Sequence, residues 1–138
     1  MKERTQEVEQ VLTERFGKDT VIALATAENG VPSVRNVNAY YEDGAFYIIT
    51  CAYSNKMKQI GSNPAVAIAG EWFTAHGRGV SLGWFGKKEN DRIAEKLKNA
   101  FAEWIDNGHN NFDDENTIIL CVELTDGLLL SHGTRYEF

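Results

Sequence analysis

The sequence has few of the residues that mark secreted, metal-binding or membrane proteins. Its 138 residues include only two cysteines, Cys51 and Cys121, too few for a disulfide scaffold and too far apart for a paired metal-ligand motif. The opening "MKERTQEVEQ" is charged, and no apolar run approaches the roughly 18 residues that a membrane span requires. We therefore expect a cytoplasmic protein that does not associate with a membrane.

Basic residues are also in deficit. Fourteen Lys and Arg stand against twenty Asp and Glu, which gives a formal net charge of −6. Because nucleic acids are bound by neutralising many phosphates with cations, this balance opposes binding to DNA or RNA and leaves room only for a local basic pocket. The three histidines, His76, His109 and His132, are widely spaced, so the sequence predicts no metal site.

The apolar residues that are present predict one domain that begins with a helix and a sheet. Hydrophobic residues make up 43% of the chain, enough to fill a core. Helical spacing indicates a helix over about residues 5–16, with its apolar stripe at Val8, Val11, Leu12 and Phe16. Three runs rich in Val, Ile and Tyr follow, separated by Asn29-Gly30 and Asp43-Gly44, dipeptides typical of tight hairpin turns. They predict a three-stranded meander.

The second half of the chain predicts more strands and one further long helix. A strand starts after Asn63-Pro64 and continues past a Gly-rich bend, and a helix is expected over about residues 87–106. Two closing strands are expected around a turn at Thr125-Asp126-Gly127. Short strands joined by hairpin turns, with helices between them, favour a mainly β fold: a small antiparallel barrel with flanking helices, in a single domain over residues 1–138.

The second predicted strand has an unusual mixture of side chains. Period two places Ser33, Arg35, Val37 and Ala39 on one face and Val34, Asn36, Asn38 and Tyr40 on the other. Neither face is cleanly apolar. Two interpretations are open: a solvated edge strand, or a strand that meets a polar ligand or partner.

A short polar segment follows the third predicted strand. Residues 54–62 can form about two helical turns, with Ser54 as the cap at the N-terminus and Asn63-Pro64 as the stop. Free backbone N–H groups at such an end attract anions, and Lys56 adds a positive charge there. With Thr50, Asn55 and Arg35, the segment resembles a phosphate pocket. The alternative is a capped connector with solvated lysines.

The order of these features resembles the pyridoxamine 5′-phosphate oxidase family of FMN-binding split barrels. The matching stretches are "GVPSVRNVNAY", then "GAFYIITCAYSNKMKQIGSNPAVAIAG", then a strand with a Gly near "AHGRGVSL". The resemblance covers roughly residues 10–82 and is to short members of the general-stress-protein type. It implies an antiparallel, Greek-key-like split barrel, and a homodimer with the cofactor at the subunit interface.

The resemblance also implies which residues hold the cofactor. The strand of residues 35–40 would lie along the flavin, with Arg35 reaching its phosphate, and Trp72 takes the place of a Gln found in the vitamin-forming members. The cofactor-binding residues implied by motif and resemblance together are Arg35, Asn36, Val37, Asn38, Ile49, Thr50, Ser54, Asn55, Lys56 and Trp72.

The expected function is that of an FMN-binding oxidoreductase acting on an unidentified small molecule, with NADH or NADPH as a possible electron donor. Tyr40 stands where the vitamin-forming members close the Arg strand with a substrate-binding Lys, so pyridoxamine phosphate oxidase activity itself is not expected. No catalytic side chain can be named. The alternatives are a non-catalytic flavin, haem or deazaflavin protein of the same fold, and an interaction domain without any cofactor.

Overall fold

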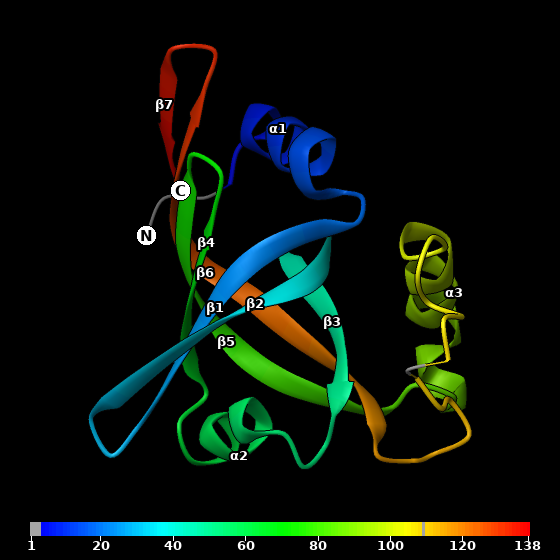
Figure 1. Cartoon of the computed structure of the whole chain (residues 1–138). Helices are drawn as coiled ribbons and strands as arrows, with labels where there is room; N and C mark the ends of the chain where they lie inside the picture. The colour runs from blue at the N-terminus through cyan, green and yellow to red at the C-terminus, as the bar shows by residue number, and fades with distance from the viewer. Residues whose placement is uncertain (1–3, 109) are drawn as a thin grey trace.

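The computed structural model describes residues 4–108 and 110–138, so His109 lies outside the described residues. Figure 1 shows a barrel of strands with a helix at each end and a third helix at its side. The elements, in chain order, are α1 (Gln6–Phe16), β1 (Thr20–Glu28), β2 (Val31–Glu42), β3 (Ala45–Cys51), α2 (Asn55–Ser62), β4 (Ala65–Gly70), β5 (Phe73–Trp84), the 3₁₀ turn η1 (Lys88–Asn90), α3 (Asp91–Ala100), β6 (Thr117–Ser131) and β7 (Thr134–Glu137).

Six of the strands close an antiparallel barrel, which confirms the predicted fold class. The order is β3-β2-β1-β4-β5-β6, and pairing of β3 with β6 completes the ring, while β7 extends the sheet beyond β6. The chain makes the meander β1-β2-β3 and then places β4 on the other side of β1, which is a Greek-key arrangement. No helix among the described residues is long and apolar enough to cross a membrane.

The two predicted hairpin turns lie where the sequence placed them. Asn29 and Gly30 have φ values of 52° and 76°, and Asp43 and Gly44 have values of 43° and 86°. Positive φ at both central residues gives the turn a twist that matches the flanking strands, which explains why these dipeptides mark it. The meander was therefore predicted correctly from local signals.

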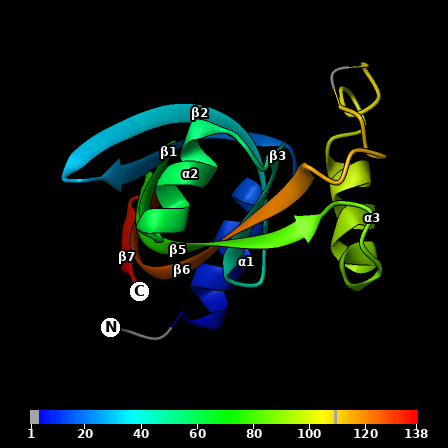
Figure 2. The ribbon, with the colours of Figure 1, turned by 90° about the horizontal axis from the view of Figure 1, so that it is seen from below.

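The barrel core is sealed at one end by α1. Thr5 caps this helix by accepting a hydrogen bond from the Val8 N–H, and the predicted stripe is buried through Val8, Leu12 and Phe16. The core cluster joins that stripe to inward-facing strand residues, among them Ile22, Leu24, Phe46, Ile68, Phe73, Leu120 and Val122. Figure 2 shows α2 across the opposite end of the barrel.

A second hydrophobic cluster lies outside the barrel, between α3 and the strands. It joins Phe85, Ile93, Leu97, Phe101, Ile105 and Ile119. The helix predicted over residues 87–106 is shorter, because the α-helix spans only Asp91–Ala100 and turns continue to residue 106. The apolar stripe is nevertheless buried as expected, since turns keep Phe101 and Ile105 on the same side.

One predicted turn was wrong. The Thr125-Asp126-Gly127 segment does not reverse the chain: β6 continues through it, with a register shift where His76 pairs with Asp126 and Gly77 pairs with Leu124. Thr125 is therefore the extra residue of a β-bulge. The reversal comes later, at His132 and Gly133, whose φ values of 50° and 77° fit a hairpin turn.

Candidate functional site

The barrel has an opening between β2 and β3, which we call the seam. β2 pairs with β1 over the whole range Val31–Ala39, but it pairs with β3 only through Tyr40–Glu42. On its other edge β3 pairs with β6 over its whole length, Ala45–Cys51, so beyond Tyr47 only the edge that faces β2 is unpaired. Each strand therefore presents one edge of backbone N–H and C=O groups to the seam, and α2 lies at the lower end of the barrel in Figure 1.

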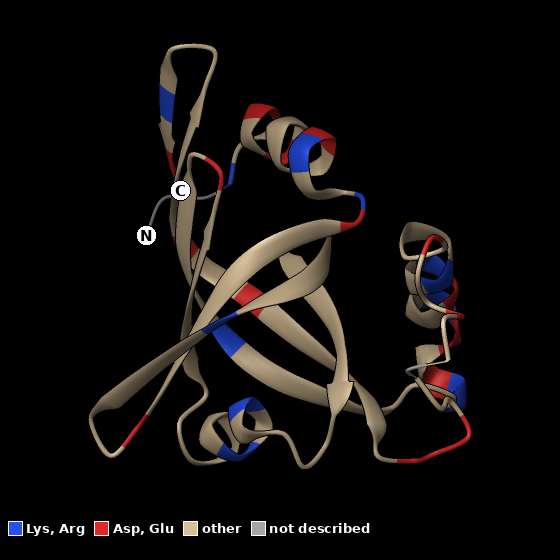
Figure 3. Ribbon diagram, in the orientation of Figure 1, with Lys and Arg blue, Asp and Glu red and all other residues tan. Residues whose placement is uncertain are grey.

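The N-terminus of α2 lies beside the end of β3, which borders this opening. Ser54 caps the helix by accepting a hydrogen bond from the Met57 N–H at 3.4 Å, and its hydroxyl also lies 3.4 Å from that of Thr50. The first two N–H groups, of Asn55 and Lys56, have no acceptor within the helix because no turn precedes them. α2 contains no Asp or Glu, as Figure 3 also shows. The end is therefore suited to an anion.

Arg35 lies on the inward face of β2, which it shares with Val37 and Ala39, at the end of the barrel that α2 covers. Its Nη1 donates to the Leu24 carbonyl oxygen at 3.1 Å and to the Thr26 hydroxyl at 2.8 Å. Its Nη2 donates to the Gln59 side-chain oxygen of α2 at 3.1 Å. The guanidinium is thus held between β1 and α2. We call Arg35, Thr50, Ser54, Asn55 and Lys56 the cationic cluster.

The two cations of this cluster, Arg35 and Lys56, repel each other, and no acidic side chain among the described residues neutralises them. Burial lowers the pKa of Lys56, and the positive charge of Arg35 lowers it further. Within residues 4–108 and 110–138, no Asp or Glu forms an ion pair with either side chain. Two like charges in a half-buried site disfavour each other, and an anion between them would relieve both.

The remaining residues predicted for the cofactor site are placed differently. Val37 packs inward against the barrel core, while Ile49 packs on the opposite face of β3 from Thr50, with the α3 cluster. Asn36 and Asn38 are exposed on the outer face of β2, where the Asn38 amide donates to Asp19 at 3.0 Å. These four residues border the seam through their backbone without joining the cationic cluster.

Trp72 lies apart from all of them. It is in the turn between β4 and β5, with φ of 55° and a relative exposure of 67%. α2 precedes β4, so the six residues of β4 separate the two, a length of about 20 Å. Trp72 and the cationic cluster of one chain are therefore at opposite ends of β4.

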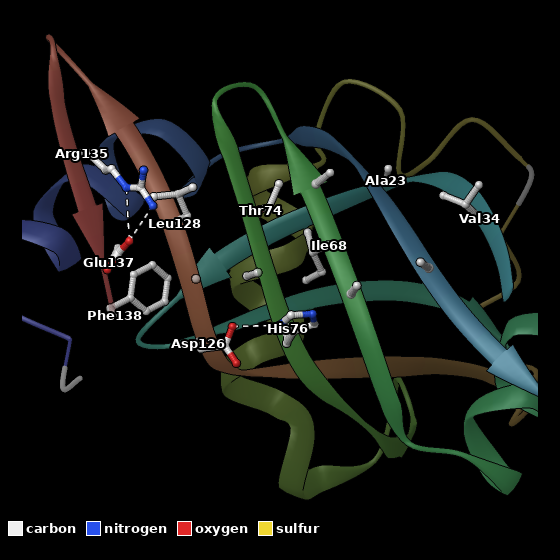
Figure 4. Close-up of a pocket in the computed structure, with 15 residues that line it drawn as sticks. Ala23, Val34, Ile68, Thr74, His76, Asp126, Leu128, Arg135, Glu137 and Phe138 are labelled. Atoms are coloured by element: carbon white, nitrogen blue, oxygen red, sulfur yellow. Dashed lines mark hydrogen bonds and ion pairs between the residues drawn. The ribbon is translucent and has the colours of Figure 1, made fainter. Parts of the chain in front are cut away.

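The outer face of the sheet carries a broad groove of about 730 Å³, which we call the alanine groove. Its floor is made of Ala23, Ala25, Ala67 and Ala69, with side chains of β5, β6 and β7 along one flank (Figure 4). On that flank the His76 Nδ1 lies 2.8 Å from the Asp126 carboxylate. The groove and the cationic cluster use opposite faces of β1 and β2.

The described residues hold no metal cluster, and Cys121 is a buried thiol. No group of three His, Cys, Asp or Glu side chains comes together among the residues that the structure describes. Cys121 is buried, and burial, followed by the charge of Glu123, raises the pKa of its thiol to about 11. At neutral pH this thiol stays protonated, as expected of a core residue.

Sequence reasoning missed two residues that the structure places beside the cluster, Thr26 and Gln59. The Thr26 hydroxyl donates to the Gln59 side-chain oxygen, and the Gln59 amide nitrogen donates to Ser33 at 3.4 Å. Thr26 did leave a signal in the sequence. Period two continues the apolar series Ile22 and Leu24 to this position, which indicates an inward-facing side chain. In the structure Thr26 is only 2% exposed, and a buried hydroxyl needs a hydrogen-bond partner.

The fold is the split barrel of pyridoxamine 5′-phosphate oxidase-like proteins, which confirms the architecture that the sequence resemblance implied. No protein-family model matches the chain, and no curated protein matches it in sequence. General stress protein 26 from Bacillus anthracis is similar at a TM-score of 0.70 and 14% identity, over 96% of this chain and 100% of that one.

Two further solved structures share the fold and differ in their ligands. A FAD-binding protein from Mesorhizobium loti is similar at a TM-score of 0.64 and 18% identity, over 86% of this chain and 90% of that one. A heme binding protein from Mycobacterium smegmatis is similar at a TM-score of 0.71 and 14% identity, over 99% of this chain and 59% of that one. At these identities the likeness concerns the fold alone.

Proposed function

We propose that this protein binds FMN through the phosphate at the cationic cluster and acts as an FMN-dependent oxidoreductase on a small molecule. The observation that carries the proposal is the pair of half-buried cations, Arg35 and Lys56, without an acidic partner in the described chain, at the N-terminus of α2. A phosphate monoester carries about −1.5 to −2 charges at pH 7 and three acceptor oxygens, which this donor set matches.

The parts of the site have separate roles in this proposal. Lys56, Arg35 and the first N–H groups of α2 bind the phosphate, and Thr50 and Ser54 offer hydroxyls next to it. The unpaired edges of β2 and β3 offer backbone groups along the seam, where Val37 and Ile49 border it. The flavin, when bound, supplies the redox chemistry, so the chain needs to bind, orient and exclude water rather than supply an acid/base pair.

A nicotinamide is the proposed electron donor, and the substrate is a small molecule other than pyridoxamine phosphate. The chain offers no dinucleotide fingerprint of its own, so the donor would bind at the seam only for the transfer. Tyr40 at the end of the Arg35 strand supports exclusion of the vitamin substrate, because a phenol cannot replace a lysine as a cation there. We place this activity in the cytoplasm.

A homodimer with the cofactor at its interface is part of the proposal. The outer face of β2 carries the exposed side chains of Val34, Asn36 and Asn38 beside the alanine groove. Val34 is 69% exposed, and small side chains on the groove floor allow close approach of another backbone. A second copy seated on this face would cover the apolar surface and could bring its Trp72 toward the seam.

The decisive experiment is an absorption spectrum and a thermal melt of the purified protein before and after FMN is added. We expect flavin bands or a rise in melting temperature with FMN, lost in Lys56→Ala and kept in Lys58→Ala, a lysine exposed on the same helix. Reduction of bound flavin by NADH or NADPH would then separate an enzyme from a binding protein. A wild-type protein that is indifferent to FMN refutes the proposal.

A non-catalytic tetrapyrrole-binding role is the second candidate, and His76 is the observation that favours it. Its Nδ1 pairs with Asp126, which leaves Nε2 free to coordinate iron beside an apolar groove. A fold neighbour is a heme binding protein. Titration with haemin tests this candidate: it requires a Soret band that His76→Ala abolishes and His132→Asn retains.

A further inference from the structure

Arg35 uses its five N–H donors unequally. Nη1 donates both of its hydrogens, one to the Leu24 carbonyl oxygen and one to the Thr26 hydroxyl. Nη2 donates one hydrogen to the Gln59 side-chain oxygen. Because the Gln59 oxygen also accepts from Thr26, these partners fill the edge between Nη1 and Nη2. The second hydrogen of Nη2 and the Nε–H have no acceptor among the described residues. They form the other edge of the fork.

That other edge is accessible. Arg35 is partly exposed, and its Nε is not among the fully buried polar atoms that lack a partner within residues 4–108 and 110–138. Two parallel N–H groups on one guanidinium edge bind two oxygens of a phosphate or carboxylate. The partners of Arg35 therefore select which edge a ligand meets.

All three partners of Arg35 are neutral acceptors: a carbonyl, a hydroxyl and an amide. They fix the guanidinium without cancelling its charge, whereas a carboxylate at the same place would do both. Arg35 and Lys56 consequently keep two positive charges for the ligand, and the pair repels until an anion arrives. This arrangement matches a ligand near two negative charges, such as a phosphate monoester.

One helix couples the two cations. Lys56 and Gln59 are three residues apart in α2, so they share a face of the helix. The amide of Gln59 is itself oriented, because its nitrogen donates to Ser33 on β2 while its oxygen faces Thr26 and Arg35. Docking of α2 beneath the barrel thus brings in one cation and orients the other in the same step.

We propose that Gln59, assisted by Thr26, is a positioning and specificity residue: it presents the free edge of Arg35 to the phosphate and keeps the site doubly positive. The inference rests on the proposed function and extends it to discrimination between FMN and riboflavin, which have the same ring system and differ by the phosphate.

The test measures dissociation constants for FMN and for riboflavin by fluorescence titration. Gln59→Glu keeps the acceptor and adds a negative charge, so we expect FMN affinity to fall by about tenfold or more while riboflavin affinity is unchanged. Gln59→Met removes the acceptor at similar length and should weaken FMN by a smaller factor. Gln10→Glu adds the same charge on the exposed face of α1 and should change neither constant.

A second position keeps the test independent of folding defects at Gln59. Thr26→Val removes the hydroxyl with little change in shape and should lower the preference for FMN, whereas Thr26→Ser should keep it. If the wild type prefers FMN but the Gln59 and Thr26 variants keep the same ratio of the two constants, the positioning role is refuted and the proposed function stands. If the wild type shows no preference for FMN, the phosphate site itself is refuted.

Discussion

Replacing Lys56 by methionine should raise the melting temperature of the ligand-free protein and lower its affinity for FMN. Methionine keeps an unbranched side chain in the half-buried position and removes the charge. Lys56 is disfavoured as a cation in the ligand-free fold, since burial and Arg35 both lower its pKa. We therefore expect the ligand-free Lys56→Met protein to melt at a higher temperature than the wild type.

The same change should weaken FMN binding. A hydrogen bond to a charged group contributes about 1.5–3 kcal/mol, so loss of one between Lys56 and the phosphate corresponds to roughly tenfold to 150-fold in the dissociation constant. Thermal denaturation without ligand and fluorescence titration with FMN measure the two effects. Lys58→Met, on the exposed side of the same helix, is the control and should change neither.

The pH dependence of stability follows from the same side chain. A lysine with a lowered pKa binds fewer protons in the folded state than in the unfolded state between that pKa and its usual value of 10.5. Stability of the ligand-free protein should therefore rise with pH across this window, and Lys56→Met should lack the rise. FMN affinity should fall over the same range, as Lys56 loses its proton. A wild-type FMN affinity that is constant up to pH 10.5, or a lower melting temperature for Lys56→Met, would refute the reasoning.

Three further predictions concern the fold and the interface. Phe46→Ala removes a ring that is 0% exposed and whose centroid lies within 6.0 Å of those of three other rings. It should lower the free energy of unfolding in denaturant by about 3–5 kcal/mol, whereas Tyr53→Ala, at a side chain that is 69% exposed, should change it little. Asn90→Ala leaves two β5 carbonyls, those of Leu82 and Trp84, without their donor and should cost about 1–3 kcal/mol by the same measurement. Val34→Glu should convert a dimer into a monomer in light scattering, and a monomeric wild type would contradict the proposed interface.

The parts of the structure that depend on neighbouring residues could be predicted from the sequence. Asn29-Gly30 and the Ser54 cap act within a few residues, so their turn and helix start follow from local backbone preferences alone. The alternation along β2 grouped Arg35 with Val37 and Ala39 on one face for the same reason, but only the packing of the barrel shows that this face is the inward one. The fold class then followed from the order of these elements and from the resemblance.

The errors and omissions involve contacts between distant parts of the chain. Thr125-Asp126-Gly127 carries turn residues, but whether such residues make a turn or a bulge depends on β5, which pairs with both sides of the segment. Gln59 gives no sequence signal, because its role exists only once α2 lies beneath β1 and β2. The role of Trp72 stays a prediction: it lies an entire strand away from Lys56 in the same chain, so it can join the site only from a second copy.

The location of the cationic cluster follows from the way the barrel closes. β3 pairs with β6 along its whole length but with β2 only through Ala45–Tyr47, so the facing edges of β2 and β3 stay unpaired where the two strands diverge. The unpaired backbone groups of these edges take water or a ligand as hydrogen-bond partners. α2 fills the lower end of the opening with its N-terminus and Lys56, and Gln59 fixes Arg35 from the same helix. The seam, the helix and the two cations thus form one structural unit, in which the positive charges and the free N–H groups of α2 favour an anionic ligand.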